Sequence, residues 1–206
     1  MSCPCSHAGS HDDDCELPSL LPSIDLPRVR CLNAAAAPAG AAARVLRPLA
    51  ERRERAAAAC LRSNAGDSEL LLHIPFTSAV QVRALCFGGL RDGSAPARAS
   101  LWVNREELDF AAAADVPPVQ ELELVEDESS DAWYPLRATR FSGVTSLALL
   151  LSGTHGGGDE SAVYFVGLKG VASGHTRQTV DAVYETRPQL ADHAARADAG
   201  GGRLGI

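Results

Sequence analysis

Residues 69–76, with the sequence Glu-Leu-Leu-Leu-His-Ile-Pro-Phe, decide the fold of this chain. The apolar run predicts a strand that ends at Ile74, because Pro75 cannot donate a ladder hydrogen bond and favours extended backbone in the residue before it. His73 lies inside this apolar strand, so we expect a partly buried histidine that makes a hydrogen bond. Taken alone, the stretch indicates a β-rich core.

Apolar residues continue with a period of two downstream of this stretch. Such alternation, or a short continuous apolar run, occurs at 80–86, 99–103, 121–124, 147–151, 163–168 and 180–184. Several short strands separated by turn signals, without alternating helices, predict an all-β fold, an antiparallel β-sandwich. We expect Phe76, Leu101, Phe141 and Phe165 to lie in its core.

The remaining segments are expected to be loops, tails and one short helix. The helix is expected at Pro48–Leu61, and Ala34–Ala43 is expected to be a loop. We attribute the alanine runs, including Ala111–Ala114, to genome composition rather than to function, and we do not count them as evidence for helices. Residues 1–23 are polar and acidic and predict a disordered tail, and the Ala/Gly-rich residues 194–206 predict a flexible one.

Length and composition fit one soluble domain with tails. The chain has 206 residues, of which 46% are hydrophobic and 22% charged, and its net charge is −7. An acidic protein is a poor partner for nucleic acid. We expect no membrane association, since no apolar run approaches the length of a span. The chain has six cysteines and no secretion signal, which indicates a reducing compartment. We therefore expect a cytoplasmic protein, and a second location in the nucleus stays open.

Different short motifs follow one another along most of the chain. The motifs are Ile24-Asp25-Leu26, Cys31-Leu32-Asn33, Val45-Leu46-Arg47-Pro48-Leu49, the stretch 69–76, Leu101-Trp102-Val103-Asn104, Tyr134-Pro135-Leu136-Arg137, Arg140-Phe141-Ser142-Gly143-Val144, Val163–Gly170 and Tyr184-Glu185. In this order and spacing, residues 24–193 resemble the PITH domain, the C-terminal module of thioredoxin-like proteins that associate with the proteasome. The His- and Cys-bearing N-terminus is most similar to the stand-alone type without a thioredoxin domain.

The resemblance implies both a fold and a role. The fold is a jelly-roll antiparallel β-sandwich of the galactose-binding-like type. The role is that of a non-catalytic protein-interaction module, with the proteasome regulatory particle or another large multi-protein assembly as its partner. Two other roles stay open. The protein could be a structural component of a cytoskeletal or ciliary assembly, or a β-sandwich that binds a glycan or a metal.

Metal ligands are concentrated in the N-terminal tail. The side chains of the types that zinc accepts there are Cys3, Cys5, His7, His11 and Cys15. A structural zinc site needs two clamps braced by a folded scaffold, so a tail that binds metal weakly or not at all is favoured over a labile zinc or copper tether. We expect no resident cofactor.

Catalytic patterns point away from an enzyme. Thioredoxin chemistry needs Cys-x-x-Cys at a helix start, and this spacing is absent from the sequence. Ser152, His155 and Asp159 share one glycine-rich loop, which is more typical of a solvated turn than of a triad. The acidic run 121–131 is expected to be a solvated face rather than a calcium site. We expect Trp102 and Trp133 to pack in the core or at its rim rather than to bind a ligand.

Positive charge is concentrated in one segment of this acidic chain. Its candidate partner-binding residues are Arg44, Arg47, Arg52, Arg53 and Arg55, with Arg62 nearby. Two interpretations stay open: salt bridging within the domain, or a surface patch that meets an acidic partner.

Overall fold

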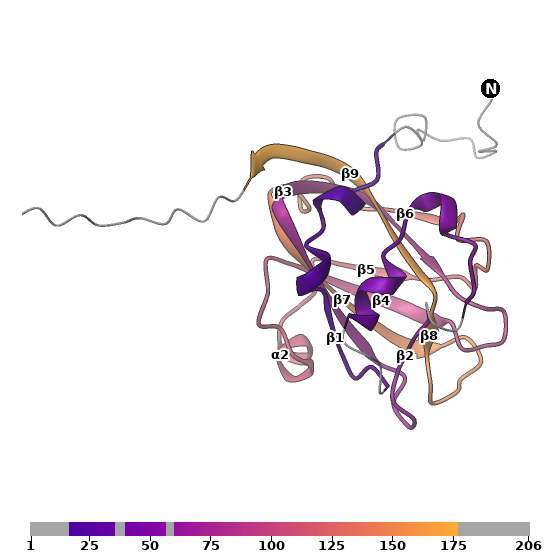
Figure 1. Ribbon diagram of the computed structural model, residues 1–206. Coiled ribbons are helices and arrows are strands. Elements are labelled where there is room, and N and C mark those ends of the chain that lie inside the picture. The colour runs from indigo at the N-terminus through magenta and orange to yellow at the C-terminus, as the bar shows by residue number, and fades with distance from the viewer. Residues whose placement is uncertain (1–16, 36–39, 57–59, 177–206) are drawn as a thin grey trace, which may run out of the picture.

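The computed structural model describes residues 17–35, 40–56 and 60–176 as a β-rich domain (Figure 1). Its strands are β1 (Arg30–Leu32), β2 (Leu61–Arg62), β3 (Leu70–Gly88), β4 (Pro96–Val103), β5 (Gln120–Glu123), β6 (Trp133–Pro135), β7 (Val144–Thr154), β8 (Ala162–Val163) and β9 (Phe165–Thr176). Its helical elements within these ranges are α2 (Phe110–Asp115) and the 3-10 turns η1 (Leu21–Ser23), η2 (Leu26–Arg28), η3 (Ala41–Val45) and η4 (Leu49–Glu51).

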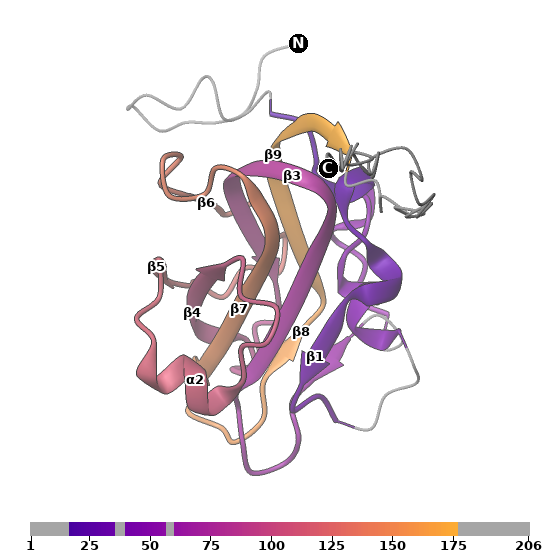
Figure 2. The ribbon, with the colours of Figure 1, turned by 90° about the vertical axis from the view of Figure 1, so that its left-hand side faces the viewer.

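The long strand β3 organises the sheet. Its first part pairs with β1 and β7, its second part pairs with β6 and β9, and every pairing is antiparallel. The register against β7 shifts between Pro75 and Val80, and there β3 curves over the top of the sandwich (Figure 2). One layer therefore contains β1-β3-β7-β4-β5, and the other is built on the second part of β3 with β9 and β6.

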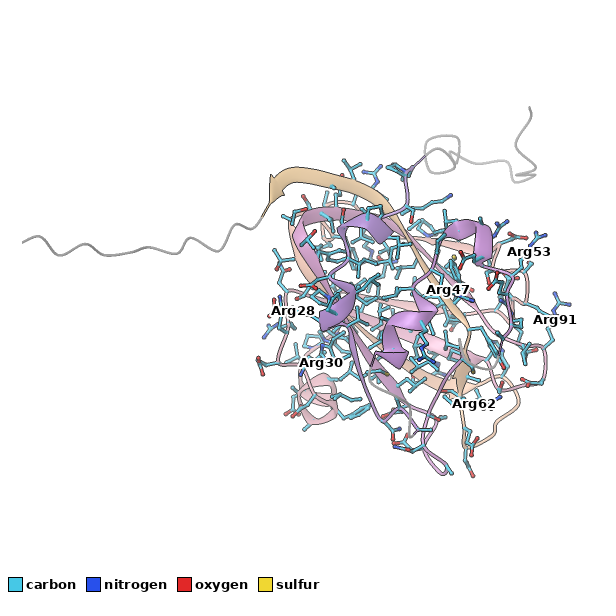
Figure 3. All side chains as sticks on the ribbon, in the orientation of Figure 1. Arg28, Arg30, Arg47, Arg53, Arg62 and Arg91 are labelled. Atoms are coloured by element: carbon cyan, nitrogen blue, oxygen red, sulfur yellow. The ribbon has the colours of Figure 1, made fainter. Side chains whose placement is uncertain are left out.

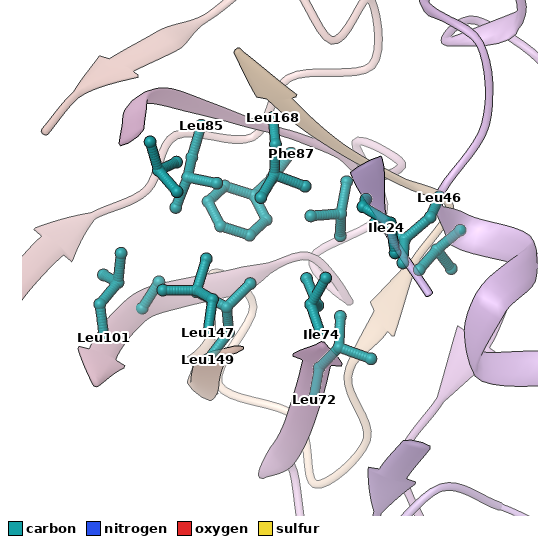
Figure 4. Packing of buried hydrophobic residues seen from close by; sticks show 14 of the residues in the cluster. Ile24, Leu46, Leu72, Ile74, Leu85, Phe87, Leu101, Leu147, Leu149 and Leu168 are labelled. Atoms are coloured by element: carbon teal, nitrogen blue, oxygen red, sulfur yellow. The ribbon is translucent and has the colours of Figure 1, made fainter. Parts of the chain in front are cut away.

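The main core lies between these two layers. Figure 4 shows Leu72, Ile74 and Leu149 of the first layer facing Leu85 and Leu168 of the second. Phe76, Leu101 and Phe141, which are expected in the core, belong to this cluster, and the fourth, Phe165, is buried outside it; all four have exposed fractions of 2% or less. The predicted all-β antiparallel sandwich is confirmed.

The prediction that the first strand ends at Ile74 is wrong, because β3 continues through Pro75. The carbonyl of Pro75 accepts a hydrogen bond from the N–H of Asp25 at 2.9 Å. In extended backbone the N–H and C=O of one residue point to the same side. The missing N–H therefore faces Asp25, beyond the Arg30–His73 pair at which β1 begins, and its absence removes no bond to β7.

The helix predictions are also corrected. Pro48–Leu61 forms no α-helix in its described residues, which contain only η4 and the start of β2. An α-helix lies instead over the alanine run 111–114, where Asp109 accepts a hydrogen bond from the N–H of Ala112 at 2.7 Å. This cap satisfies a backbone donor that the first turn leaves unpaired.

Helix α2 covers the outer face of the first layer. A second apolar cluster lies beneath it, formed by Leu71, Trp102, Leu108 and Ala148. The indole N–H of Trp102 donates to the carbonyl of Val116 at 2.9 Å, so this side chain belongs to the cluster. The first layer is therefore covered on both faces over part of its area.

The domain begins earlier than expected. Residues 17–23 were assigned to the disordered tail, but Leu20 is buried in the main core and its N–H donates to the carbonyl of Leu168. The other tail predictions, and the strand expected at Val180–Tyr184, fall at residues 1–16 and 177–206, outside the described ranges.

Candidate interaction sites

Arg47 connects the arginine-rich segment, residues 44–62, to the residue that precedes β9. Its guanidinium donates to the carbonyl of Tyr164 at 2.9 Å and to that of Glu54 at 3.2 Å, and it pairs with the Glu54 carboxylate at 3.4 Å. The side chain is only 12% exposed. Arg47 therefore acts within the domain, where it satisfies backbone acceptors that the irregular chain leaves open.

Arg52 and Arg53 converge on one carboxylate. The nitrogen–oxygen distances to Asp131 are 2.8 Å for Arg52 and 2.7 Å for Arg53. Arg55 donates to the carbonyl of Glu128 and to the hydroxyl of Ser130 in the same loop. The structure thus brings Arg52, Arg53 and Arg55 together on the loop 127–131, whereas Arg44 lies apart in η3.

Asp127 organises the loop that receives these arginines. Its carboxylate accepts hydrogen bonds from the N–H groups of Ser129, Asp131 and Ala132 and from the Ser129 hydroxyl, at 2.6–2.9 Å. Burial alone would raise the pKa of this carboxyl, but these hydrogen bonds outweigh it and hold the pKa below its ordinary value. The Asp-x-Ser pattern at Asp127 and Ser129 is a sequence signal for such a turn.

Two carboxylates of the acidic run are therefore engaged within the domain, whereas Glu121, Glu123 and Glu128 are exposed. Asp127 holds backbone amides and Asp131 holds two arginines. Within residues 17–35, 40–56 and 60–176, no group of three or more His, Cys, Asp or Glu side chains is placed to hold a metal ion. The proposed tail ligands, from Cys3 to Cys15, lie outside these ranges.

The loop at 152–159 shows no triad. No hydrogen bond joins Ser152, His155 and Asp159 in the described structure, and His155 is exposed. Trp133 is half-buried, with the Lys169 ammonium 4.3 Å from its ring centroid. One face of its ring is thus in contact with a neighbouring cation.

The described cysteines are separate thiols: Cys31, Cys60 and Cys86. Burial raises the pKa of the Cys31 and Cys86 thiols from 9.0 to about 12. Because the thiolate is the nucleophile, both should be poorly reactive at neutral pH.

We expect iodoacetamide to alkylate Cys31 and Cys86 at least about a hundredfold more slowly in the folded protein than in urea, as followed by mass spectrometry. In the same preparation, insulin reduction with dithiothreitol should not exceed that of a cysteine-free variant. Labelling of either thiol within about tenfold of its rate in the unfolded chain would show that burial does not protect it.

A polar cavity of about 290 Å³ lies on the outer face of the first layer. His73 of β3 and Ser146 of β7 line it, and each is 5% exposed. Arg28 and Arg30 line it from the side of β1 (Figure 3), and Glu106 and Glu107 line it from the loop before α2. The sequence predicted the burial of His73 but gave no signal for this cavity, because its residues come from four separate segments.

Burial and the nearby charge of Arg30 lower the pKa of His73, although a hydrogen bond to the backbone of Leu108 opposes this. The ring is therefore neutral at neutral pH. His73 Nε2 and Ser146 Oγ have no hydrogen-bond partner in the described part of the protein. They are not hydrogen-bonded to each other, so they form no activated nucleophile.

Sequence comparison finds one family along most of the chain. A family model described as PITH domain matches residues 10–188. The PITH domain-containing protein ZK353.9 of Caenorhabditis elegans is 33% identical, over 92% of this chain and 93% of the relative. PITH domain-containing protein 1 of Homo sapiens is 32% identical, over 82% and 78% respectively.

Fold comparison finds solved structures of low sequence identity. CpGH89CBM32-5 from Clostridium perfringens, solved in complex with GalNAc-β-1,3-galactose, has a TM-score of 0.45 and 10% identity, and the match covers 71% of this chain and 99% of that one. A fucolectin from Morone saxatilis has a TM-score of 0.45 and 12% identity, with 73% and 50% covered. At these values the similarity does not extend to what those proteins bind.

Proposed function

This chain belongs to the PITH domain family, and from that premise we propose that it is a non-catalytic protein-interaction module of a large assembly. The regulatory particle of the proteasome is the first candidate, because PITH domains occur in thioredoxin-like proteins that associate with the proteasome. Membership of this family is the observation that carries the proposal. No helix in the described ranges has the length and apolar character that a membrane span requires.

Arg52, Arg53 and Arg55, which contact the loop 127–131, support the proposal of an electrostatic docking surface. Arg53 has a side chain that is 64% exposed, and with Arg91 it lines a shallow hollow of about 440 Å³ (Figure 3). Exposed arginines on an acidic protein attract acidic partners and orient them, and they present planar donors that match a carboxylate.

Asp131 competes with an incoming carboxylate for the same arginines. It already occupies Arg52 and Arg53, so an incoming carboxylate has to replace it. Exposed ion pairs contribute only about 0–1 kcal/mol each, so such an exchange is energetically accessible.

We expect Arg52→Glu with Arg53→Glu to weaken co-purification of the assembly, and raised salt to weaken wild-type binding in parallel. The measurement is affinity purification of the tagged protein with quantitative mass spectrometry. Arg137→Glu with Arg140→Glu is the matched control, because it makes the same charge change at exposed residues without a described side-chain partner. Equal loss in both double variants would show that net charge matters and not this surface.

Asp131→Ala should have the opposite effect. It releases Arg52 and Arg53 from their internal partner while leaving Asp127 in place, so partner recovery should increase. Recovery of proteasome subunits would identify the assembly, and recovery of axonemal proteins would favour the ciliary alternative. If no multi-protein assembly co-purifies with any variant, the proposed function is wrong.

A further inference from the structure

Two side chains that line the cavity beside His73 each carry a buried polar atom without a hydrogen-bond partner in the described part of the protein. His73 Nε2 and Ser146 Oγ both belong to side chains that are 5% exposed. An unsatisfied buried polar group typically destabilises a fold by about 1–3 kcal/mol. Two such groups on one cavity wall indicate a surface shaped to pair with something else.

The strand register places these groups on the outer face of the first layer. His73 pairs with Arg30 of β1 on one side and with Ala148 of β7 on the other. Ala148 belongs to the apolar cluster under α2, so this row of side chains faces away from the main core. The cavity thus opens on the face that carries α2, with His73 and Ser146 on strands β3 and β7 and Glu106 and Glu107 on the loop before α2.

The charges that line the cavity balance. Arg28 pairs with Asp25 at 3.7 Å and with the Glu106 carboxylate at 3.4 Å, and Arg30 donates to the backbone carbonyl of Glu106. The charged groups that line the cavity are two guanidinium groups and the carboxylates of Glu106 and Glu107, so the lining has no net charge, and the further carboxylate of Asp25 pairs with Arg28. A ligand group with a full charge would lose hydration there without gaining an opposite excess charge.

The floor of the cavity presents one hydrogen-bond acceptor and one group that can donate or accept. The neutral imidazole of His73 hydrogen-bonds to the backbone of Leu108, and Nε2 remains as an acceptor. The hydroxyl of Ser146 can donate or accept. A primary carboxamide offers an N–H donor next to a carbonyl acceptor, so one planar, uncharged group can satisfy both atoms.

We propose that this cavity binds an uncharged carboxamide, presented by an asparagine or glutamine side chain of the partner protein. The source rests on the proposed function as an interaction module. The volume of about 290 Å³ suits a single inserted side chain, because pockets for whole small molecules begin near this size. Insertion would anchor the partner near the centre of a polar contact.

The first test uses propionamide as the probe and the full-length protein with ¹⁵N-labelled histidine. We expect a saturable change in the Nε2 resonance of His73, while the exposed His155 in the same sample stays unchanged. Propionate and propylammonium, which have the same length but carry a charge, should bind at least about tenfold more weakly. Ser146→Ala should weaken propionamide binding by a similar factor.

The outcomes separate the cavity from the function. The carboxamide site is overturned if the His73 resonance shows no saturable change, responds equally to all three probes, or changes no more than that of His155. The cavity would then hold ordered water or an adventitious additive only. Ser146→Ala should also reduce recovery of the co-purified assembly. If Ser146→Ala leaves the recovery of the assembly unchanged, the carboxamide does not come from a side chain of the partner protein. If no assembly co-purifies with the wild-type protein, the proposed function alone is wrong.

Discussion

Replacement of Phe141 by alanine is expected to lower the free energy of unfolding by about 3–5 kcal/mol, as measured by urea denaturation. The side chain is 0% exposed and belongs to the main core, so its removal leaves a cavity between the two layers. Its backbone carbonyl also accepts a hydrogen bond from the N–H of Val82 at 3.0 Å, which limits how far the site can collapse. Such a loss is a large share of the stability of a typical domain.

Phe110→Ala is the matched control for this prediction. Phe110 is only partly buried and packs against the second cluster, so we expect a smaller loss of about 1–2 kcal/mol. Losses of equal size would show that the two clusters contribute alike. A loss below about 1 kcal/mol in Phe141→Ala would contradict the burial of this ring.

Asp127→Ala is expected to lower the free energy of unfolding by about 2–4 kcal/mol. The carboxylate is 9% exposed, and its removal leaves the N–H groups of Ser129, Asp131 and Ala132 without their acceptor. The loop that presents Asp131 to the arginines should lose its shape as well, so co-purification should weaken in parallel.

Asp92→Ala provides a close control. Asp92 accepts from the N–H and hydroxyl of Ser94, as Asp127 does from Ser129, but it lies on an exposed loop. We expect it to change stability by less than about 1 kcal/mol. Equal effects of the two substitutions would contradict the special role of Asp127.

The contribution of Asp127 should depend on pH. Because its pKa in the folded protein is held below the ordinary value of 3.8, the stabilisation is fully present above that value and is lost as the pH falls through the folded pKa. The stability difference between wild type and Asp127→Ala should therefore be constant near neutral pH and shrink below pH 3.8. A difference that grows on acidification would show that the pKa is raised instead.

Local patterns predicted the parts of the fold that depend on local chemistry. Alternation of apolar residues located the strands and the burial of Phe76 and Phe165, because a buried strand face must be apolar. It could not show that β3 continues through Pro75, since that depends on which side of the strand meets a neighbour. The helix over 111–114 was missed because its alanines were discounted, although Asp109 stands at the cap position.

The candidate sites depended on longer-range contacts. The arginine segment was visible as a concentration of charge, but the acceptors of Arg47 and Arg52 lie 117 and 79 residues away along the chain. The cavity beside His73 needs the register of β1, β3 and β7, which no periodicity specifies. Whether the arginines also meet a partner stays a prediction.

The continuity of β3 has a mechanical consequence. A single strand of 19 residues pairs with β1 and β7 in one layer and with β6 and β9 in the other. A force applied to either layer therefore passes to the other through covalent backbone, and not only through side-chain contacts. The two layers should therefore yield together under load rather than separate one after the other.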